Sequence, residues 1–385
     1  MDRILVLLIN LTILVGCCRN GDNSYDGSTH TYQVEIESAI YNGQEVKLSD
    51  YVTSFDYIPV ETNDNFLVSD LFKFSPCDDY IALCCHATQQ VYQISNDGKL
   101  LKKIGRRGNG KDEYIAVKNV ISTPESINVY MGKKIISYYA NSGDIKLILN
   151  TNDLDNIKLI GSLALFGKDS IAILHNKENN ENYLSIINKE SIQVDSIRLW
   201  ETKMRKIDVQ LPGGQVIQMD WAYMSALYSF SDTLRVTNDF IDTIFTYKNE
   251  DLIPYTIFKY GKLDNNRYEP VLNTDIAFNS LKLMETQNLF LFENMNGVKF
   301  IYDKINKETK RIAKFENSNY QGFTNDIDNG IPFWPVAVTK EKMYSFISAD
   351  IFIEEAAKSN SQKMKQVAAT LTEDSNPVIV VATLK

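Results

Sequence analysis

The chain of 385 residues carries a formal net charge of −9, from 40 basic and 49 acidic residues, and holds no block of basic residues. Because a polyanion would be repelled on average, this balance argues against nucleic acid as a partner. The 21 Tyr and 18 Phe residues, together with many β-branched residues, favour strands over helices.

The chain begins with a short charged start, followed by a largely apolar run of 12 residues over 4–15 and then by Gly16 and Cys17. Twelve residues are too few to cross a bilayer, which needs about 20, so this run indicates the core of a signal peptide. The stretch "LVGC" resembles a bacterial lipobox. The resemblance implies that residues 1–16 are removed and that Cys17 is lipidated, whereas an ordinary secretory signal is the alternative.

Residues 17–32 are small, polar and rich in turn formers, which predicts a flexible tether ahead of a folded part over 33–385. The other cysteines include Cys77, in a turn, and the pair Cys84 and Cys85, in a predicted strand. Neighbours in a strand point to opposite faces, so this pair is not placed to form a disulfide. Buried free thiols are therefore expected.

A strand–turn–strand unit recurs along the chain, over residues 91–105, 136–150, 183–197, 243–261 and 298–315. Several of the turns place Asn, Asp and Gly where a hairpin needs positive φ. Equivalent residues of the five first strands are Tyr92, Tyr139, Ile186, Phe245 and Tyr302, which are 47, 47, 59 and 57 residues apart. A repeat of about 40–50 residues with four strands is typical of a β-propeller.

The two ends of the chain predict how the ring closes. Residues 45–61 alternate like a strand at the start, and residues 343–349 and 376–385 read as two strands at the end. Pairing of the termini in one blade would close the ring, so the fold expected is an all-β, six-bladed propeller. Residues 349–374 are rich in Ala, Glu, Lys and Gln and predict a small helical insertion, which is either a surface decoration or a lid or partner contact.

The chain resembles a family of six-bladed β-propeller lipoproteins of gut anaerobes, distantly akin to the NHL-repeat propellers. The resemblance rests on the lipobox and on the stretches "FDYIPVET" (55–62), "GKLLKKIGRRGNGKDEY" (98–114) and "NDIDNGIPFWP" (325–335) with the ending "NPVIVVATLK". It implies a propeller at the cell envelope and supplies no established enzymatic activity. Many members have Pro-Gly where this chain has Lys111-Asp112, so a different turn is expected there.

The glycine- and arginine-rich stretch "IGRRGNGKDEYIAV" (104–117) resembles a phosphate-binding loop at first sight. A P-loop requires a Lys followed by Ser or Thr and then a helix, and here a strand pattern follows instead. We therefore expect this stretch to connect a blade ending near Ile104 with one beginning near Tyr114, its glycines shaping the turn. An anion or sugar contact is the functional alternative, with the candidate residues Arg106, Arg107, Asn109, Glu113 and Tyr114.

Three other predicted blade connections, over 199–224, 260–278 and 315–338, are long and rich in aromatic and amide side chains. Aromatic rings beside Asn and Asp suit sugar rings or peptide side chains, which makes Trp221, Tyr268 and Trp334 candidate ligand contacts. The alternative is that these rings cap the blades and fill the space between them.

Evidence for catalysis is weak. Oxygen ligands of the kind Ca²⁺ prefers are offered by Asn325, Asp326 and Asp328, but these residues do not match an EF-hand loop. The three histidines are scattered along the sequence and favour neither a zinc site nor a catalytic triad. No catalytic residue is assigned and no cofactor is expected, with Ca²⁺ as a weak candidate.

The sequence thus predicts a lipid-anchored propeller of the cell envelope, in the outer membrane, which binds or scaffolds a glycan, a peptide or a partner envelope protein. A hydrolase or lactonase with a metal in the channel is the alternative. A sensor or assembly module of an uptake complex is a third hypothesis.

Overall fold

The computed structural model describes residues 31–68, 71–150, 159–167, 170–176, 181–188, 194–201, 204–210, 214–222, 225–238, 242–263, 281–294, 296–315 and 320–385. Residues 31–385 belong to one compact unit. The predicted signal peptide (1–16), Cys17 and the tether up to residue 30 lie outside the described residues.

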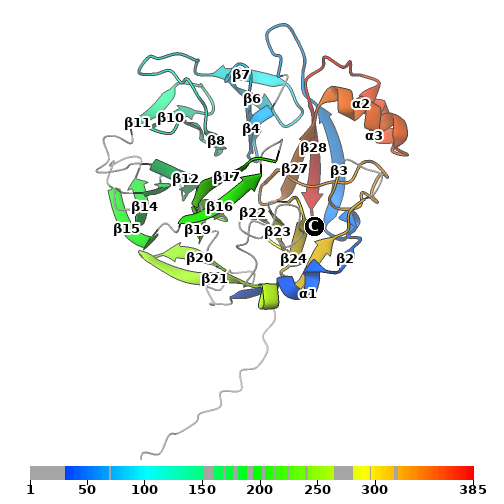
Figure 1. Ribbon diagram of the computed structural model, residues 1–385. Coiled ribbons are helices and arrows are strands. Elements are labelled where there is room, and N and C mark those ends of the chain that lie inside the picture. The colour runs from blue at the N-terminus through cyan, green and yellow to red at the C-terminus, as the bar shows by residue number, and fades with distance from the viewer. Residues whose placement is uncertain are drawn as a thin grey trace, which may run out of the picture. The chain divides into compact units, whose positions relative to one another are not determined.

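Six β-sheets of at least four strands are arranged as blades around a central axis (Figure 1), which confirms the predicted six-bladed propeller. Blade 1 holds β4 (Leu71–Pro76), β5 (Tyr80–Cys85), β6 (Val91–Ser95) and β7 (Leu100–Ile104). Blade 2 holds β8 (Asn119–Ser122), β9 (Ser126–Tyr130), β10 (Lys134–Tyr139) and β11 (Ile145–Asn150). Blade 3 holds β12 (Leu159–Phe166), β13 (Ser170–Asn176), β14 (Glu181–Asn188) and β15 (Val194–Glu201).

The remaining blades use segments from both ends of the chain. Blade 4 holds β18 (Ser225–Phe230), β19 (Thr233–Asn238), β20 (Thr243–Lys248) and β21 (Asp251–Lys259). Blade 5 holds β22 (Leu281–Glu285), β23 (Leu289–Asn294), β24 (Lys299–Asp303) and β25 (Glu308–Ile312). Blade 6 holds β26 (Ala337–Val338), β27 (Lys342–Ile347), β28 (Val378–Leu384) and β3 (Val52–Pro59).

The repeat seen in the sequence corresponds to the third and fourth strands of blades 1 to 5. The five aligned residues all lie in third strands, namely β6, β10, β14, β20 and β24. The first two strands of each blade lie outside this repeat.

The chain start crosses the outer edges of three consecutive blades. Strand β1 (Tyr32–Glu35) pairs in parallel with β21 of blade 4, and β2 (Gly43–Gln44) pairs in parallel with β25 of blade 5. The short helices α1 (Ile36–Ile40) and η1 (Leu48–Asp50) lie before and after β2, and β3 then pairs antiparallel with β28 along Val52–Pro59. The predicted closure by the two termini is confirmed.

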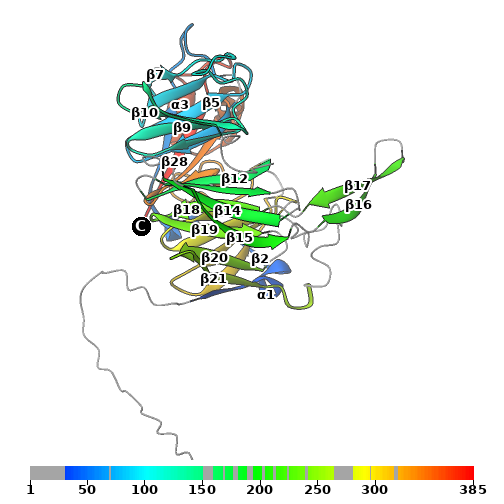
Figure 2. The same ribbon diagram turned by 90° about the vertical axis from the view of Figure 1, so that its left-hand side faces the viewer.

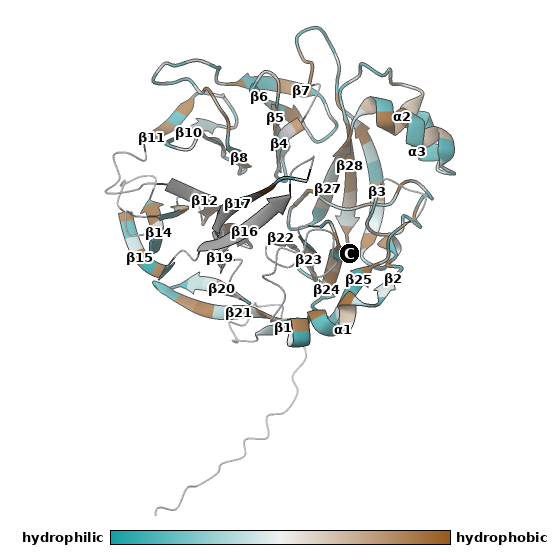
Figure 3. Ribbon diagram, viewed as in Figure 1, coloured by the Kyte–Doolittle hydropathy of each residue, from teal (hydrophilic) through white to brown (hydrophobic). Residues whose placement is uncertain are grey.

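Six buried apolar clusters match the six interfaces between neighbouring blades. Each blade contributes side chains to the clusters on both of its faces, because successive side chains of a strand point to opposite sides of the sheet. Cys84 faces the cluster shared with blade 2, whereas Cys85 faces the cluster shared with blade 6. Both are buried free thiols, as is Cys77, in agreement with the expectation from the sequence. Figure 3 shows hydrophobic and hydrophilic residues alternating along outer strands such as β3, β11 and β15.

Two helices near the C-terminus, α2 (Ala349–Lys358) and α3 (Gln362–Ala368), lie between β27 and β28. Phe352, Ala356 and Met364 are buried in the cluster between blades 5 and 6. The Ser361 hydroxyl accepts a hydrogen bond from the Met364 amide at 3.0 Å and so caps α3. The helices therefore extend the core of the last blade.

The predicted long connection over 199–224 contains a two-stranded hairpin, β16 (Met204–Gln210) and β17 (Val216–Ala222), which extends away from the blades (Figure 2). A single 3-10 turn, η3 (Gly261–Leu263), follows β21. The hairpin corrects the expectation of a loop, since alternating apolar residues on both sides of "LPGG" satisfy the strand pattern.

Because neighbouring strands within a blade are antiparallel, the turn between its first and second strands lies at the opposite end from the connection to the next blade. We call these turns the inner turns. They span 77–79, 123–125, 167–169, 231–232, 286–288 and 339–341, of which 168 and 169 lie outside the described residues.

Candidate functional site

A cavity of about 710 Å³ opens at the end of the central channel that carries the inner turns, and we call it the channel mouth. The innermost strands β8, β12, β18 and β26 form its wall, and inner turns of blades 1, 2, 3, 4 and 6 form its rim. Residues from five blades therefore converge on one space, although they are far apart in the sequence.

The channel mouth combines an acidic rim with a wall that is only partly apolar. Asp78, Glu125 and Asp232 are exposed on the rim, where Lys340 is the sole cation among the described lining residues. The wall includes the aliphatic residues Leu163 and Leu227, at 6% and 8% exposure, beside polar residues such as Ser229. Such a cavity favours a ligand that joins a positive charge to an apolar group, because opposite charges at the rim attract it.

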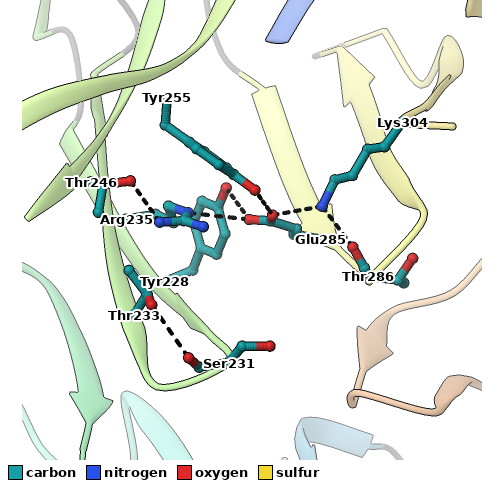
Figure 4. A network of polar contacts seen from close by, with 9 residues as sticks. All are labelled: Tyr228, Ser231, Thr233, Arg235, Thr246, Tyr255, Glu285, Thr286 and Lys304. Atoms are coloured by element: carbon teal, nitrogen blue, oxygen red, sulfur yellow. Dashed lines mark hydrogen bonds and ion pairs between the residues drawn. The ribbon is translucent and has the colours of Figure 1, made fainter. Parts of the chain in front are cut away.

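A buried network of charges lies behind this wall, between blades 4 and 5 (Figure 4). The Glu285 carboxylate accepts hydrogen bonds from the Tyr255 hydroxyl at 2.6 Å and from the Lys304 ammonium at 2.7 Å. The Tyr228 hydroxyl donates to the same carboxylate at 3.0 Å, and Arg235 Nε lies 3.4 Å from it.

The cations of this network have further partners. The Arg235 guanidinium lies 3.5 Å from the centre of the Tyr255 ring and donates to the Thr246 hydroxyl at 2.6 Å. Burial lowers the pKa of Lys304, whereas the Glu285 carboxylate acts to raise it. Because Tyr228 also lines the channel mouth, the network fixes part of the wall. We assign it a positioning role, since the Glu285 side chain is fully buried.

The arginine-glycine stretch forms the connection between blades 1 and 2. Strand β7 ends at Ile104 as expected, but β8 begins at Asn119 rather than near Tyr114. Tyr114 is fully buried, and its hydroxyl donates to the Ile104 carbonyl at 2.7 Å and accepts from the Val91 amide at 3.0 Å. This side chain therefore packs between the blades, and its hydrogen bonds hold the connection out of strand geometry.

Glu113 organises the turn. Its carboxylate lies 2.6 Å from Arg106 Nε and accepts a hydrogen bond from the Gly110 amide at 2.8 Å. Glu113 and Arg106 thus form an ion pair, while Arg106, Arg107 and Asn109 remain exposed. These residues lie at the opposite end of the blades from the inner turns.

The structure describes the side chain of one of the three aromatic candidates, Trp334. Trp334 is half-buried, stacks on Phe323 with 5.9 Å between ring centres and lines a small cavity of about 60 Å³. It packs between blades 5 and 6, whereas Tyr114 packs between blades 1 and 2, so the two do not belong to one site. Tyr268 and the side chain of Trp221 lie outside the described residues.

The oxygen-rich stretch near residue 325 ties the helices to the blades. The Asp328 carboxylate accepts from the Ser361 hydroxyl at 2.5 Å and from the Asn325 amide at 2.6 Å. Asp326 accepts from the Ser49 amide at 2.9 Å and from its hydroxyl at 2.6 Å. These bonds connect the stretch to α3 and η1.

Within the described ranges, no group of three His, Cys, Asp or Glu side chains lies close enough to hold a metal ion. Among the same residues no helix is long and apolar enough to cross a membrane.

The sequence did not single out the inner turns. Asp78, Glu125 and Asp232 each follow the first strand of a blade, which is a recognisable position once the blades are known. The sequence repeat did not reveal this position, because the turns that follow the first strands share no common motif.

The six blades define a β-propeller, and the channel mouth is a cavity at one end of its central channel. Residues 31–383 match the family described as "Domain of unknown function (DUF4934)", and the chain belongs to this family. No curated protein matches the sequence.

One solved structure supports the fold, and two others show weaker likeness. A Bacteroides fragilis protein described as exported is 12% identical, with a TM-score of 0.63, over 92% of this chain and 100% of its own. A streptogramin B lyase is 10% identical, with a TM-score of 0.37, over 69% of this chain and 88% of its own. A DUF4221 member from Bacteroides vulgatus is 10% identical, with a TM-score of 0.38, over 70% and 79% of the two chains. At these identities the first likeness concerns the fold alone, and the other two carry no argument.

Proposed function

We propose that the protein is an exported, lipid-anchored binding propeller of the bacterial cell envelope, attached through Cys17 to the outer membrane. Its ligand is a positively charged peptide segment of a partner envelope protein, held at the channel mouth. The lipobox supports the anchor, and the description of the similar Bacteroides fragilis protein as exported is in keeping with it.

The observation that carries this proposal is the acidic rim above a partly apolar wall. Asp78, Glu125 and Asp232 surround a cavity of about 710 Å³ whose wall mixes apolar and uncharged polar side chains. A basic side chain or a free amino group fits the rim, and a neighbouring aliphatic side chain fits the wall. Attraction between exposed charges weakens with salt, so the affinity should be salt-dependent.

The proposal is tested by fluorescence anisotropy with two labelled peptides of equal length, one alternating Lys and Leu and the other alternating Glu and Leu. We expect the full chain to bind the basic peptide, and the variant Glu125→Gln/Asp232→Asn to bind it at least several-fold more weakly. Glu354→Gln, which removes an exposed carboxylate from α2, is the matched control and should bind like the wild type. Equal binding of both peptides, or unchanged binding by the double variant, would contradict the proposal.

The alternative of a hydrolase or lactonase with a channel metal stays a hypothesis, since no observation on the described residues favours it. The same holds for ligand binding by Arg106, Arg107, Asn109 and the aromatic connections.

A further inference from the structure

A second cavity, of about 450 Å³, lies between blades 5 and 6 beside the channel mouth, and we call it the chain-end pocket. The inner turn of blade 5, the start of β3 and the last residues of the chain contribute to it, and Lys340 lines both cavities. Its volume lies within the range of about 300–1,000 Å³ that is usual for small-molecule sites.

The lining offers uncharged groups that both donate and accept hydrogen bonds. The side-chain amides of Gln287 and Asn288 line the pocket and make no hydrogen bond to another described residue. Each amide carries an acceptor oxygen and two N–H donors. Such a pair matches adjacent hydroxyl groups, because a hydroxyl also donates and accepts.

Tyr51 adds a third group of this kind. Its ring packs on Phe323 with 5.8 Å between ring centres, and its hydroxyl makes no hydrogen bond to another described residue. Burial and the nearby Asp303 carboxylate raise the pKa of Tyr51. The phenol therefore keeps its proton at neutral pH and is available as a donor and an acceptor.

The other properties of the pocket narrow the class of ligand. Leu384 and the strongly exposed Ile305 supply apolar surface for C–H groups. The carboxylates of Asp50, Asp303 and Glu341 outnumber the ammonium groups of Lys340 and Lys385, which disfavours an anion. The lining consists of turns and strand ends rather than an unpaired strand edge, which is where an extended peptide is usually bound.

We propose that the chain-end pocket is a binding site for a neutral saccharide, whose hydroxyl groups meet Gln287, Asn288 and Tyr51. This site is separate from the proposed peptide site at the channel mouth.

The test is saturation-transfer NMR on the full chain in deuterated detergent, with maltose, cellobiose, lactose and mannobiose as probes. At least one disaccharide should show ring-proton signals with the wild type. The variant Gln287→Ala/Asn288→Ala should bind that probe at least about tenfold more weakly, the effect of losing one or two hydrogen bonds of about 1 kcal/mol each. Asn360→Ala removes an exposed amide between α2 and α3, away from both cavities, and should leave binding unchanged.

The channel-mouth variant Glu125→Gln/Asp232→Asn separates the two proposals, because it should lose the basic peptide and keep the saccharide. If the double alanine variant shows a lower Tm, Tyr51→Phe, which keeps the ring and deletes the hydroxyl, replaces it and should bind several-fold more weakly. Absence of any saccharide signal with the wild type overturns the proposal. Equal binding by the folded variant overturns it as well.

Discussion

The Glu285 carboxylate and the Lys304 ammonium lie 2.7 Å apart inside the propeller, with side-chain exposures of 0% and 5%. Glu285 ends the first strand of blade 5, and Lys304 follows the third strand of the same blade. Arg235 of blade 4 approaches the same carboxylate, with 8% of its side chain exposed. One buried carboxylate thus forms ion pairs with two buried cations at the interface between blades 4 and 5.

Glu285→Gln should destabilise the protein strongly, by about 3–5 kcal/mol, because it leaves Lys304 and Arg235 buried without their counter-charge. The free energy of unfolding, from urea titration, measures the effect. The control is Glu354→Gln, which breaks an exposed ion pair with Lys358 and should change stability by at most about 1 kcal/mol. Similar losses in both variants would contradict a special role for the buried network.

Gly105→Ala should destabilise the connection between blades 1 and 2. Gly105 has φ of +56°, and an added Cβ would lie 2.3 Å from the Tyr138 hydroxyl. The left-handed backbone costs roughly 1–2 kcal/mol and overpacking roughly 1–3 kcal/mol more. Gly132→Ala is the matched control, since its φ is +90° and nothing lies within 4 Å of its added Cβ. Urea unfolding should show the larger loss for Gly105→Ala, and equal losses would rule out the predicted clash.

Stability should fall steeply in alkali. Burial raises the pKa of Tyr130 and Tyr138 from 10.0 to about 12. Between these values the folded state keeps protons that the unfolded state loses. The stabilisation is therefore complete below pH 10 and is lost as the pH rises through 12, by about 1.4 kcal/mol per pH unit for each tyrosine.

Urea unfolding at about pH 9 and about pH 11 measures this slope. Tyr130→Phe removes one of these titrating hydroxyls, which donates to the Gly132 carbonyl in the folded state. The slope of stability against pH should therefore become shallower by the contribution of one tyrosine. A free energy of unfolding that stays constant over this range would contradict the prediction.

Cys17→Ser should abolish incorporation of labelled palmitate in cells and release the protein from the membrane fraction. Cys18→Ser is an internal control, because the neighbouring thiol has no place in the proposed lipobox chemistry and its loss should leave labelling intact. Labelling that persists in Cys17→Ser would favour another acylation site, whereas absence of labelling in the wild type would favour an ordinary secretory signal.

The sequence by itself was enough to predict the six-bladed fold and the third and fourth strands of blades 1 to 5. Turns such as "NDGK" and "NSGD", with alternating strands on either side, are local signals because hairpin geometry depends on adjacent residues. The two terminal strands, the free cysteines on opposite faces and the helices before β28 follow from equally local patterns.

Tertiary structure alone decided which side chains meet. Asp78, Glu125 and Asp232 lie in turns of three different blades and share a cavity because the ring brings equivalent turns to one end. Likewise, Glu285 meets Arg235 across 50 residues of sequence. Short-range patterns fix hairpins, whereas the partners of a buried charge and the lining of a cavity depend on how whole blades pack, which no local pattern encodes.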